Sequence, residues 1–573
     1  MSDFPEYIIS CNGAPLKKYD SDAKYLELEY KEGIKKNVNI ELNNFLTKVL
    51  HLKERYKDLL EIAGYIFAAD RKSSRGKPEY LEQHSWSRSF HFHIKVRDYN
   101  FWNRPDVKSA LSEALCFMTG DHRYEFTFYK AAPDFPSSLF DNEKLELNPA
   151  KNLSIVLFSG GLDSLAGVIE RIETTDEQIC LVSHQSGQPG VTRTQNQLFK
   201  AINNLYPDRC KHYKFHCGLS HTKSVDETQR TRAFLYSSTA FTIANTYKQK
   251  SIYVYENGIT TINFAKTQDL MNGRASRTTH PKTLGLLEKL FEKISEDSFK
   301  INHPYFFKTK TDVFEVIKKY NKVNLLDSAV SCSRTRNHPA NFTHCGVCSQ
   351  CIDRIFASFA AGAEEYDDNG IYYLRFYKDN LEDDEVKKAL IDYIRLANES
   401  ANTNIDYFYK KRAYELVDII EYLNDKTYEE GLERIFNLCQ RHSKQIEHSI
   451  QRLSKLYDKP FSPRNPKSFF SLIIGMRAYQ QDTRNIEVRS GEVRSGNGNE
   501  VNIATTLKPF RRGELQEILN KYITDMDLQM GVSVPNKKVQ QITRKIIQDG
   551  WDGKENSIAE TLRKMGYVEG KRK

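Results

Sequence analysis

The sequence predicts an α/β protein built around an open, mostly parallel sheet, with an N-terminal α+β segment and helical C-terminal regions. Three observations predict it. An apolar, β-prone run at 153–158 ends in the glycine turn SGGLDS, and a helical stretch follows. Residues 90–96 and 124–130 alternate apolar and polar side chains, which is typical of strands. Residues 366–480 carry apolar side chains three and four apart, which is typical of amphipathic helices.

The N-terminal segment, residues 1–150, is expected to form an α+β extension. Residues 105–120 have a proline at the predicted start of a helix and a glycine after its end. Charged residues gather at 66–88, among them Asp70, Arg71, Arg75 and Arg88. One interpretation of this stretch is a packing or oligomerisation domain with surface arginines.

The turn after the run at 153–158 has the features of an anion-binding loop. Its glycines let the backbone approach a ligand closely, and the helix that follows adds the partial positive charge of its N-terminus. Asp163 beside a phosphate requires a cation between the two, which indicates Mg²⁺. An ordinary glycine turn between strand and helix is the alternative. The predicted nucleotide-binding residues are Ser159, Gly160, Gly161, Leu162, Asp163 and Ser164.

Four of the ten cysteines have the spacing of a metal site: Cys332, Cys345, Cys348 and Cys351. Four thiolates can close a tetrahedral zinc site, and a site closed in this way is structural. Gly346 is expected to allow the tight turn that the paired cysteines require. An iron–sulfur cluster or free thiols are the alternatives.

Composition gives weaker constraints. The chain has 573 residues, 28% charged residues and a net charge of +9, which permits an anionic partner without requiring one. We find neither the basic start and apolar core of a signal peptide nor an apolar run near the roughly 20 residues that span a bilayer. We therefore expect a cytoplasmic protein without a membrane partner.

The loop and the cysteines together carry a resemblance to known families. SGGLDS after a strand and before a helix resembles the PP-loop of the ATP pyrophosphatases, and the added four-cysteine knuckle is similar to the 7-cyano-7-deazaguanine synthase family. Within 152–362, Arg232 matches the family's helix-leading arginine and Lys310 its Thr-Lys segment. Arg354 matches the arginine that trails the zinc motif. The stretch at 66–88 resembles an N-terminal extension of large, defence-associated relatives.

The resemblance implies a fold of the adenine nucleotide alpha hydrolase type and the cofactors ATP, Mg²⁺ and Zn²⁺. It implies an ATP-dependent ligase or synthase that adenylates the carboxylate of a 7-deazaguanine-type substrate and passes it to an amine. That amine is ammonia, giving an amide and then a nitrile, or an amino group of a partner protein, in a specialised role such as antiviral defence. The implied catalytic residues are Asp163, Ser164, Lys310 and Arg232.

This chain departs from the family pattern in its substrate region. Ala233 stands where the family has asparagine. The family's Tyr-Pro-Asp-Cys-Arg stretch has no clean counterpart, and in the nearest segment, 274–285, only Pro281 aligns. These departures leave the exact substrate and the amine open. The alternative functions are a PP-loop enzyme that modifies tRNA and a non-catalytic, nucleotide-binding assembly subunit.

The remaining expectations concern domains and histidines. The stripe Val386, Leu390, Tyr393 and Leu396 is expected to be core. Cys210, His212 and His216 should share one face of a strand and Cys217 the other, which disfavours a second metal site at 209–221 and leaves His216 or His221 as candidates near the nucleotide. The basic C-terminal region could contact nucleic acid, but a solvated helical face is favoured. The expected parts are 1–150, a PP-loop domain at 151–365, a helical domain at 366–483, a linker at 484–500 and a basic helical region at 501–573.

Overall fold

The computed structural model divides into two compact units, residues 1–474 and 475–573. Every helix and strand below belongs to the first unit, and the predicted linker and basic region at 484–573 lie outside the described residues. The structure describes residues 5–16, 22–30, 36–41, 52–75, 87–132, 152–185, 189–226, 229–264, 277–334, 339, 341–368, 370–401, 403–423, 427–458 and 465–475.

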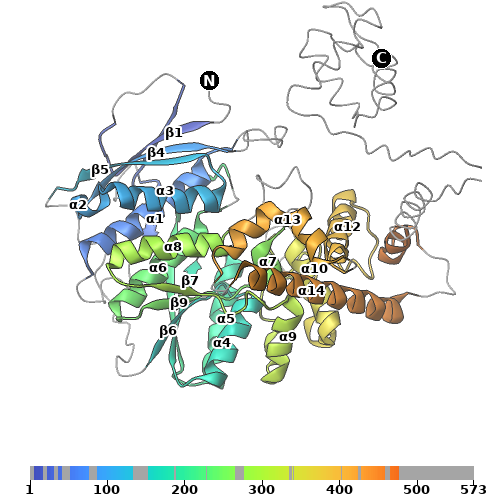
Figure 1. The fold of residues 1–573 in the computed structure, drawn as a ribbon. Coiled ribbons are helices and arrows are strands. Elements are labelled where there is room, and N and C mark those ends of the chain that lie inside the picture. The colour runs from blue at the N-terminus through green and yellow to red at the C-terminus, as the bar shows by residue number, and fades with distance from the viewer. Residues whose placement is uncertain are drawn as a thin grey trace, which may run out of the picture. The chain divides into compact units, whose positions relative to one another are not determined.

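The N-terminal segment contains a parallel sheet with strand order β2-β1-β4-β5. Its two longest strands are those that alternation predicted. Helices α1 to α3 lie along one side of this sheet (Figure 1). Pro105 starts α3, and Gly120 ends it with φ +72°, as the sequence predicted. The bounds are β1 Glu6–Cys11, β2 Lys24–Leu28, β4 Ser89–Val96, β5 Arg123–Lys130, α1 Glu54–Lys72, α2 Tyr99–Trp102 and α3 Pro105–Thr119.

The central sheet has the order β10-β9-β6-β7-β8-β3. Neighbouring strands from β10 to β8 run parallel, whereas β3 pairs antiparallel with β8. The mixed α/β class with a parallel sheet is thus confirmed. Because β3 comes from the N-terminal segment, the sheet includes chain from both sides of the division expected at 150/151. The strands are β3 Val38–Glu41, β6 Leu153–Leu157, β7 Gln178–Gln185, β8 Cys210–Leu219, β9 Ser251–Tyr253 and β10 Lys300–Asn302.

Helices cover both faces of this sheet, so its inner strands β6 and β7 are buried almost throughout. Alternate residues of β6, β7 and β8 enter two separate cores. One core includes α1, α6 and α8, and the other includes α4, α5, α9 and α10. Cys210 and Cys217 lie in different cores, as alternation predicted. The helices are α4 Leu162–Thr174, α5 Pro189–Leu205, α6 Arg232–Thr246, α7 Gly258–Ile262, α8 Pro281–Ser295, α9 Lys310–Lys319, α10 Ser349–Ala361 and α11 Glu364–Asp367.

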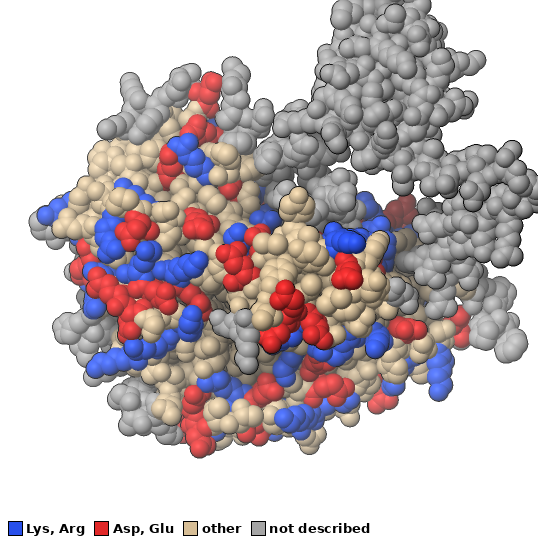
Figure 2. All heavy atoms as spheres, in the orientation of Figure 1, with Lys and Arg blue, Asp and Glu red and all other residues tan. Residues whose placement is uncertain are grey.

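Three further helices, α12 Asp384–Glu399, α13 Ile405–Ile420 and α14 Tyr428–Tyr457, follow α10 and α11. α12 and α14 pack beside α10 (Figure 1). Acidic and basic side chains are interspersed over the face shown in Figure 2. Within the described part of the chain, every helix is too short or too polar to span a bilayer.

Candidate functional site

A cavity of about 1080 Å³ opens at the carboxyl ends of β6, β7 and β9. Ligands of open parallel sheets bind at this edge. The cavity reaches from the predicted phosphate loop to the four-cysteine segment and on to α12, α13 and α14. All four predicted catalytic residues line it, namely Asp163, Ser164, Arg232 and Lys310.

The predicted phosphate loop connects β6 to α4 and follows the expected strand–turn–helix geometry. Gly160 has φ +83°, a conformation that side chains other than glycine rarely adopt. Gly161 is the N-cap of α4 and offers no side chain to the free N–H groups of the first turn. Of the six predicted loop residues, all except Gly160 line the cavity. The loop therefore presents a helix N-terminus to the cavity, where an anion would be favoured.

Two serine hydroxyls brace the loop from within. The Gly161 N–H donates to Ser159 Oγ at 3.2 Å, and Ser164 Oγ donates to the Gly161 carbonyl at 2.9 Å. The two hydroxyl oxygens lie 3.2 Å apart. The two serines predicted to bind the nucleotide thus already hold the turn in shape, and a ligand would share these hydroxyls with the backbone.

Asp163 and Lys310 form a buried ion pair beside the loop. Lys310 Nζ lies 2.7 Å from Asp163 Oδ1, and the side chains of Lys310 and Asp163 are 3% and 6% exposed. Asn257 donates to the other oxygen, Asp163 Oδ2, from its backbone N–H at 3.0 Å and from Nδ2 at 2.9 Å. Lys310 starts α9, and the Thr309–Asp312 capping box fixes that helix start. The Thr-Lys-Thr-Asp motif therefore positions Lys310.

Charge and burial set the protonation of this cluster. Burial alone would raise the pKa of Asp163, but the Lys310 charge and the hydrogen bonds to the carboxylate lower it below its ordinary value. Burial and then the Asp163 charge raise the pKa of Glu256 well above its ordinary value. Burial opposes the charge of Lys310, yet the surrounding carboxylates raise its pKa. The cluster thus holds an ionised Asp163, a protonated Lys310 and a protonated Glu256.

Arg232 stands apart from this cluster on the cavity wall. It is the first residue of α6, it is exposed, and its guanidinium lies over the Tyr236 ring at 5.6 Å. Within the described part of the chain, no carboxylate forms an ion pair with it. Its charge is therefore available to an anionic ligand.

Several lining residues were not predicted. Asp353 follows the zinc motif, and Tyr393 Oη donates to its Oδ1 at 2.5 Å. His442 of α14 packs edge-on against Tyr393. The stripe on α12 was predicted as core, which is wrong for half of it: Val386 and Leu390 are buried, but Tyr393 and Leu396 line the cavity. Helical spacing cannot distinguish a side chain that faces a core from one that faces an internal cavity.

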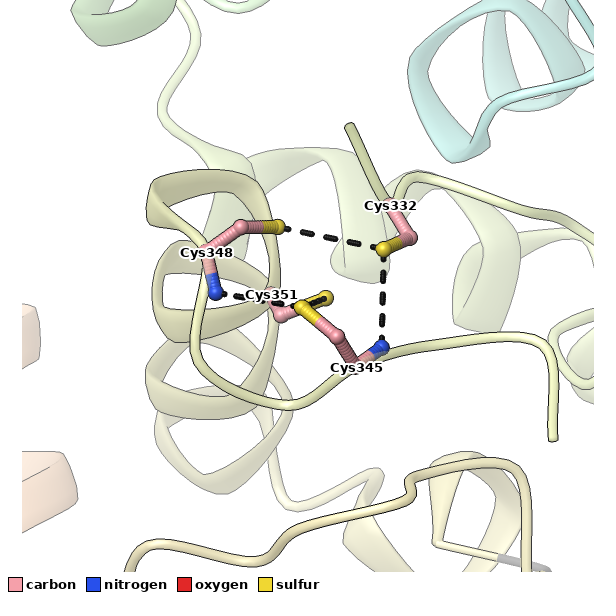
Figure 3. Close-up of side chains that lie close together, drawn as sticks. All are labelled: Cys332, Cys345, Cys348 and Cys351. Carbon is pink, nitrogen blue, oxygen red and sulfur yellow. Dashed lines mark hydrogen bonds between the residues drawn. The ribbon is translucent and has the colours of Figure 1, made fainter. Parts of the chain in front are cut away.

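The four predicted metal cysteines come together at the start of α10, as Figure 3 shows. Their sulfurs all lie within 4.8 Å of one another, with 4.0 Å between Cys332 and Cys348 and 3.9 Å between Cys345 and Cys351. Zinc–sulfur bonds of about 2.3 Å in a tetrahedron require sulfurs about 3.8 Å apart. The cluster therefore fits a zinc ion, and the described residues contain no second group of this kind.

Arg354 is a support of the knuckle and not a ligand-binding residue. It is 0% exposed, and its Nε and Nη2 donate to Asp367 Oδ1 at 2.9 and 2.6 Å. Nη2 and Nη1 also donate to the carbonyls of Leu326 and Ala329. The arginine thus ties α10 to the segment that leads to Cys332.

The predicted turn at Gly346 is confirmed and can be tested. Its φ is +81°, and a Cβ there would lie 1.7 Å from the Leu374 carbonyl oxygen. We expect Gly346→Ala to lower the free energy of unfolding by about 3 kcal/mol or more and to weaken metal retention. Gly370→Ala is the matched control, because Gly370 has φ +74° but open space around its Cβ. Thermal melts measure the stability of both variants, and metal analysis measures their metal retention. Equal effects of the two substitutions would contradict the predicted clash with Leu374.

The histidines of β8 do not reach the cavity. His212 Nε2 lies 2.9 Å from Ser183 Oγ, and His216 Nδ1 lies 2.6 Å from the Gln185 carbonyl oxygen. Neither His216 nor His221 lines the cavity, so their predicted place near the nucleotide is not what the structure shows. The histidines that line the cavity are His442 of α14 and His184, at the end of β7, whose Nε2 donates to the Cys217 carbonyl. Burial lowers the pKa of His184 to about 3.

The proton on Glu256 gives a pH prediction. The folded protein holds this proton to higher pH than the unfolded chain, so stability falls as pH rises above the unfolded pKa of about 4.3. Glu256→Gln removes this loss of stability at high pH, because its amide does not ionise, and the amide keeps an N–H donor toward Asp163. We expect it to raise the melting temperature by a few degrees at pH 8 and little at pH 4. The exposed Glu315→Gln is the control; an equal change at both pH values for Glu256→Gln would contradict the assignment.

Comparison with known proteins adds no identification, because no family model and no curated protein matches the chain.

Proposed function

We propose that this chain is a PP-loop ATP pyrophosphatase similar to the 7-cyano-7-deazaguanine synthases. In this proposal it adenylates the carboxylate of a 7-deazaguanine-type substrate. One observation carries the proposal: the SGGLDS loop, Lys310 and Arg232 face a single cavity at the carboxyl edge of a parallel sheet. The adjacent four-cysteine cluster supports the comparison, because the resemblance joins these two features in one domain.

The β- and γ-phosphates of ATP would lie on the first turn of α4. There the free backbone N–H groups and the helix dipole favour negative charge. Lys310 and Arg232 supply two of the positive side chains that line the cavity, for the phosphates or the substrate carboxylate. Asp163 offers the carboxylate oxygens that Mg²⁺ prefers, and Mg²⁺ would neutralise phosphate charge there.

The chemistry follows from the poor reactivity of a carboxylate. Its oxygen attacks the α-phosphorus of ATP, the bond to the bridging oxygen breaks, and pyrophosphate leaves. The resulting acyl adenylate carries a good leaving group. An amine then attacks the acyl carbon, AMP leaves, and the amine loses a proton. Fixed N–H groups and cations stabilise the charge that develops on the departing pyrophosphate.

The amine is ammonia or an amino group of a partner protein. The cavity volume of about 1080 Å³ exceeds the usual upper range for a small-molecule site, roughly 1,000 Å³. Its far end is lined by α12, α13 and α14, which leaves room beyond the loop for an acceptor. We propose that the amine is an amino group of a partner protein, and that the protein has a specialised role such as antiviral defence. The zinc ion would be structural, since four cysteines leave no open position.

Pyrophosphate release tests the proposal. Wild-type protein should release pyrophosphate from magnesium ATP only when 7-carboxy-7-deazaguanine is present. Asp163→Ala should lower the rate by about 10²-fold or more. The exposed Asp297→Ala is the control and should leave the rate unchanged.

Two outcomes would contradict the proposal and support an alternative. If no deazapurine acid leads to pyrophosphate release, alone or with partner proteins, the result supports the non-catalytic assembly subunit. If the protein instead modifies tRNA and binds it with an affinity that falls steeply with salt, the result supports the RNA-modifying enzyme.

A further inference from the structure

A buried ion cluster at the end of α1 connects the N-terminal segment to the start of α6. The cluster comprises Asp70, Arg75, Arg88 and Asp121. Arg88 is 0% exposed; its Nη2 lies 2.6 Å from Asp70 Oδ1, and its Nε lies 3.0 Å from Asp121 Oδ1. Arg75 contacts both carboxylates as well. The interpretation of this stretch as a domain with surface arginines is therefore wrong for Arg75 and Arg88.

The cluster also touches the start of α6. Asp70 Oδ2 accepts the Thr231 backbone N–H at 3.1 Å and the Thr231 hydroxyl at 3.0 Å. Thr231 is 0% exposed and is the N-cap of α6, and Arg232 is the next residue. One carboxylate thus faces the ion cluster with one oxygen and the helix start with the other.

The chain before α6 is held a second time by the same region. The Arg71 carbonyl accepts the N–H groups of Val225 and Asp226 at 2.7 and 3.1 Å. Arg75 pairs with the Asp226 carboxylate at 3.3 Å. Residues 225–226 and Thr231, on either side of the segment that leads to Arg232, are therefore both fixed by residues 70–75.

We propose that Asp70 is a positioning residue for Arg232, so that the N-terminal segment completes the anion site of the cavity. This inference rests on the proposed function, because it takes Arg232 to bind an anionic ligand. Arg232 directly follows Thr231 in the chain, so fixing the Thr231 backbone fixes the point from which the Arg232 side chain extends along the cavity wall. Burying charged groups is costly, and apolar side chains could fill the same core without that cost. A buried ion cluster here therefore supports a positioning role in addition to packing.

Matched variants separate positioning from stability. Asp70→Asn leaves one acceptor oxygen where two are needed. Thr231→Val removes the hydroxyl donor, and Thr231→Ser retains it. Asp121→Asn breaks the same cluster, but the Asp121 carboxylate bonds Arg75, Arg88 and Tyr124 and not Thr231. Arg232→Gln removes the positive charge itself. Each variant is made in the full chain.

Calorimetry and steady-state kinetics with magnesium ATP and with 7-carboxy-7-deazaguanine give the test. Arg232→Gln should weaken the binding of one of these two ligands. For that ligand, we expect Asp70→Asn and Thr231→Val to raise Kd and KM about three- to tenfold, with kcat changed less. Thr231→Ser and Asp121→Asn should stay within about twofold, although Asp121→Asn lowers the melting temperature. In a chain that already carries Arg232→Gln, Asp70→Asn should not raise Kd or KM further. The proposal would be overturned if Asp70→Asn raised Kd as much in that chain as in wild-type protein, or if Asp121→Asn raised Kd as much as Asp70→Asn.

Hydrogen exchange keeps the test independent of catalysis. Amides at 229–234 should exchange faster in Asp70→Asn and Thr231→Val than in Asp121→Asn. If wild-type protein binds neither ligand, the proposed function fails, and this exchange pattern still decides whether Asp70 fixes the helix start. Equal exchange in all three variants would overturn the positioning role.

Discussion

Lys310→Met is expected to reduce pyrophosphate release by about 10²- to 10³-fold, because in the proposed function it removes a fixed positive charge next to the phosphates of ATP. It should also lower the free energy of unfolding by about 3 kcal/mol. Lys310 is 3% exposed and 2.7 Å from Asp163, so its loss leaves a buried carboxylate without its cation. Single-turnover assays and chemical denaturation measure the two effects separately.

Two comparisons isolate the role of Lys310. Lys308→Met is the control, since Lys308 pairs with Glu170 at 3.4 Å and is 31% exposed. The double variant Lys310→Met with Asp163→Asn removes both charges; it should recover stability but not activity. Recovery of activity in that variant, or normal activity in Lys310→Met, would show that the pair only holds the fold.

Loss of the metal is expected to have the largest effect on stability. Binding of structural zinc in small domains contributes on the order of 10 kcal/mol, and this contribution is lost when a ligand is removed. Cys348→Ser or strong chelation should therefore unfold the region around α10. Because Cys332 also lines the cavity, ligand binding should fall with it. Metal analysis should find one zinc per wild-type chain.

Cys439→Ser is the matched control for this effect, because Cys439 is also a buried thiol but lies outside the cluster. It should retain zinc and lose little stability. Iron and sulfide in the purified protein, or a chain that resists chelation and holds no metal, would contradict the zinc assignment.

Local patterns predicted the parts of the site that follow one another in the chain. The strand before Ser159, the helix after Gly161 and the knuckle around Gly346 are each determined within a few residues, and the structure has them. The four-cysteine cluster was predictable because cysteines at metal-ligand spacing are rarely there for packing alone.

Long-range partners were not predictable in this way. Asn257 lies 94 residues from Asp163, and Glu256 stands beside it; nothing in their local sequence indicates that they join the loop. The strand β3 pairs with β8 across more than 170 residues. Asp70 meets Thr231 from another part of the chain, so arginines that read as surface residues became a buried cluster. Only the packed fold brings these groups together.

Oxygen transfer from the substrate tests the central claim most directly. The carboxylate of 7-carboxy-7-deazaguanine is labelled with oxygen-18 and incubated with magnesium ATP, ammonium and purified partner proteins. Adenylation followed by attack of an amine moves one labelled oxygen to AMP, so mass spectrometry should find labelled AMP with wild-type protein and none with Asp163→Ala. Unlabelled AMP, or ADP as the nucleotide product, would contradict adenylation of the acid.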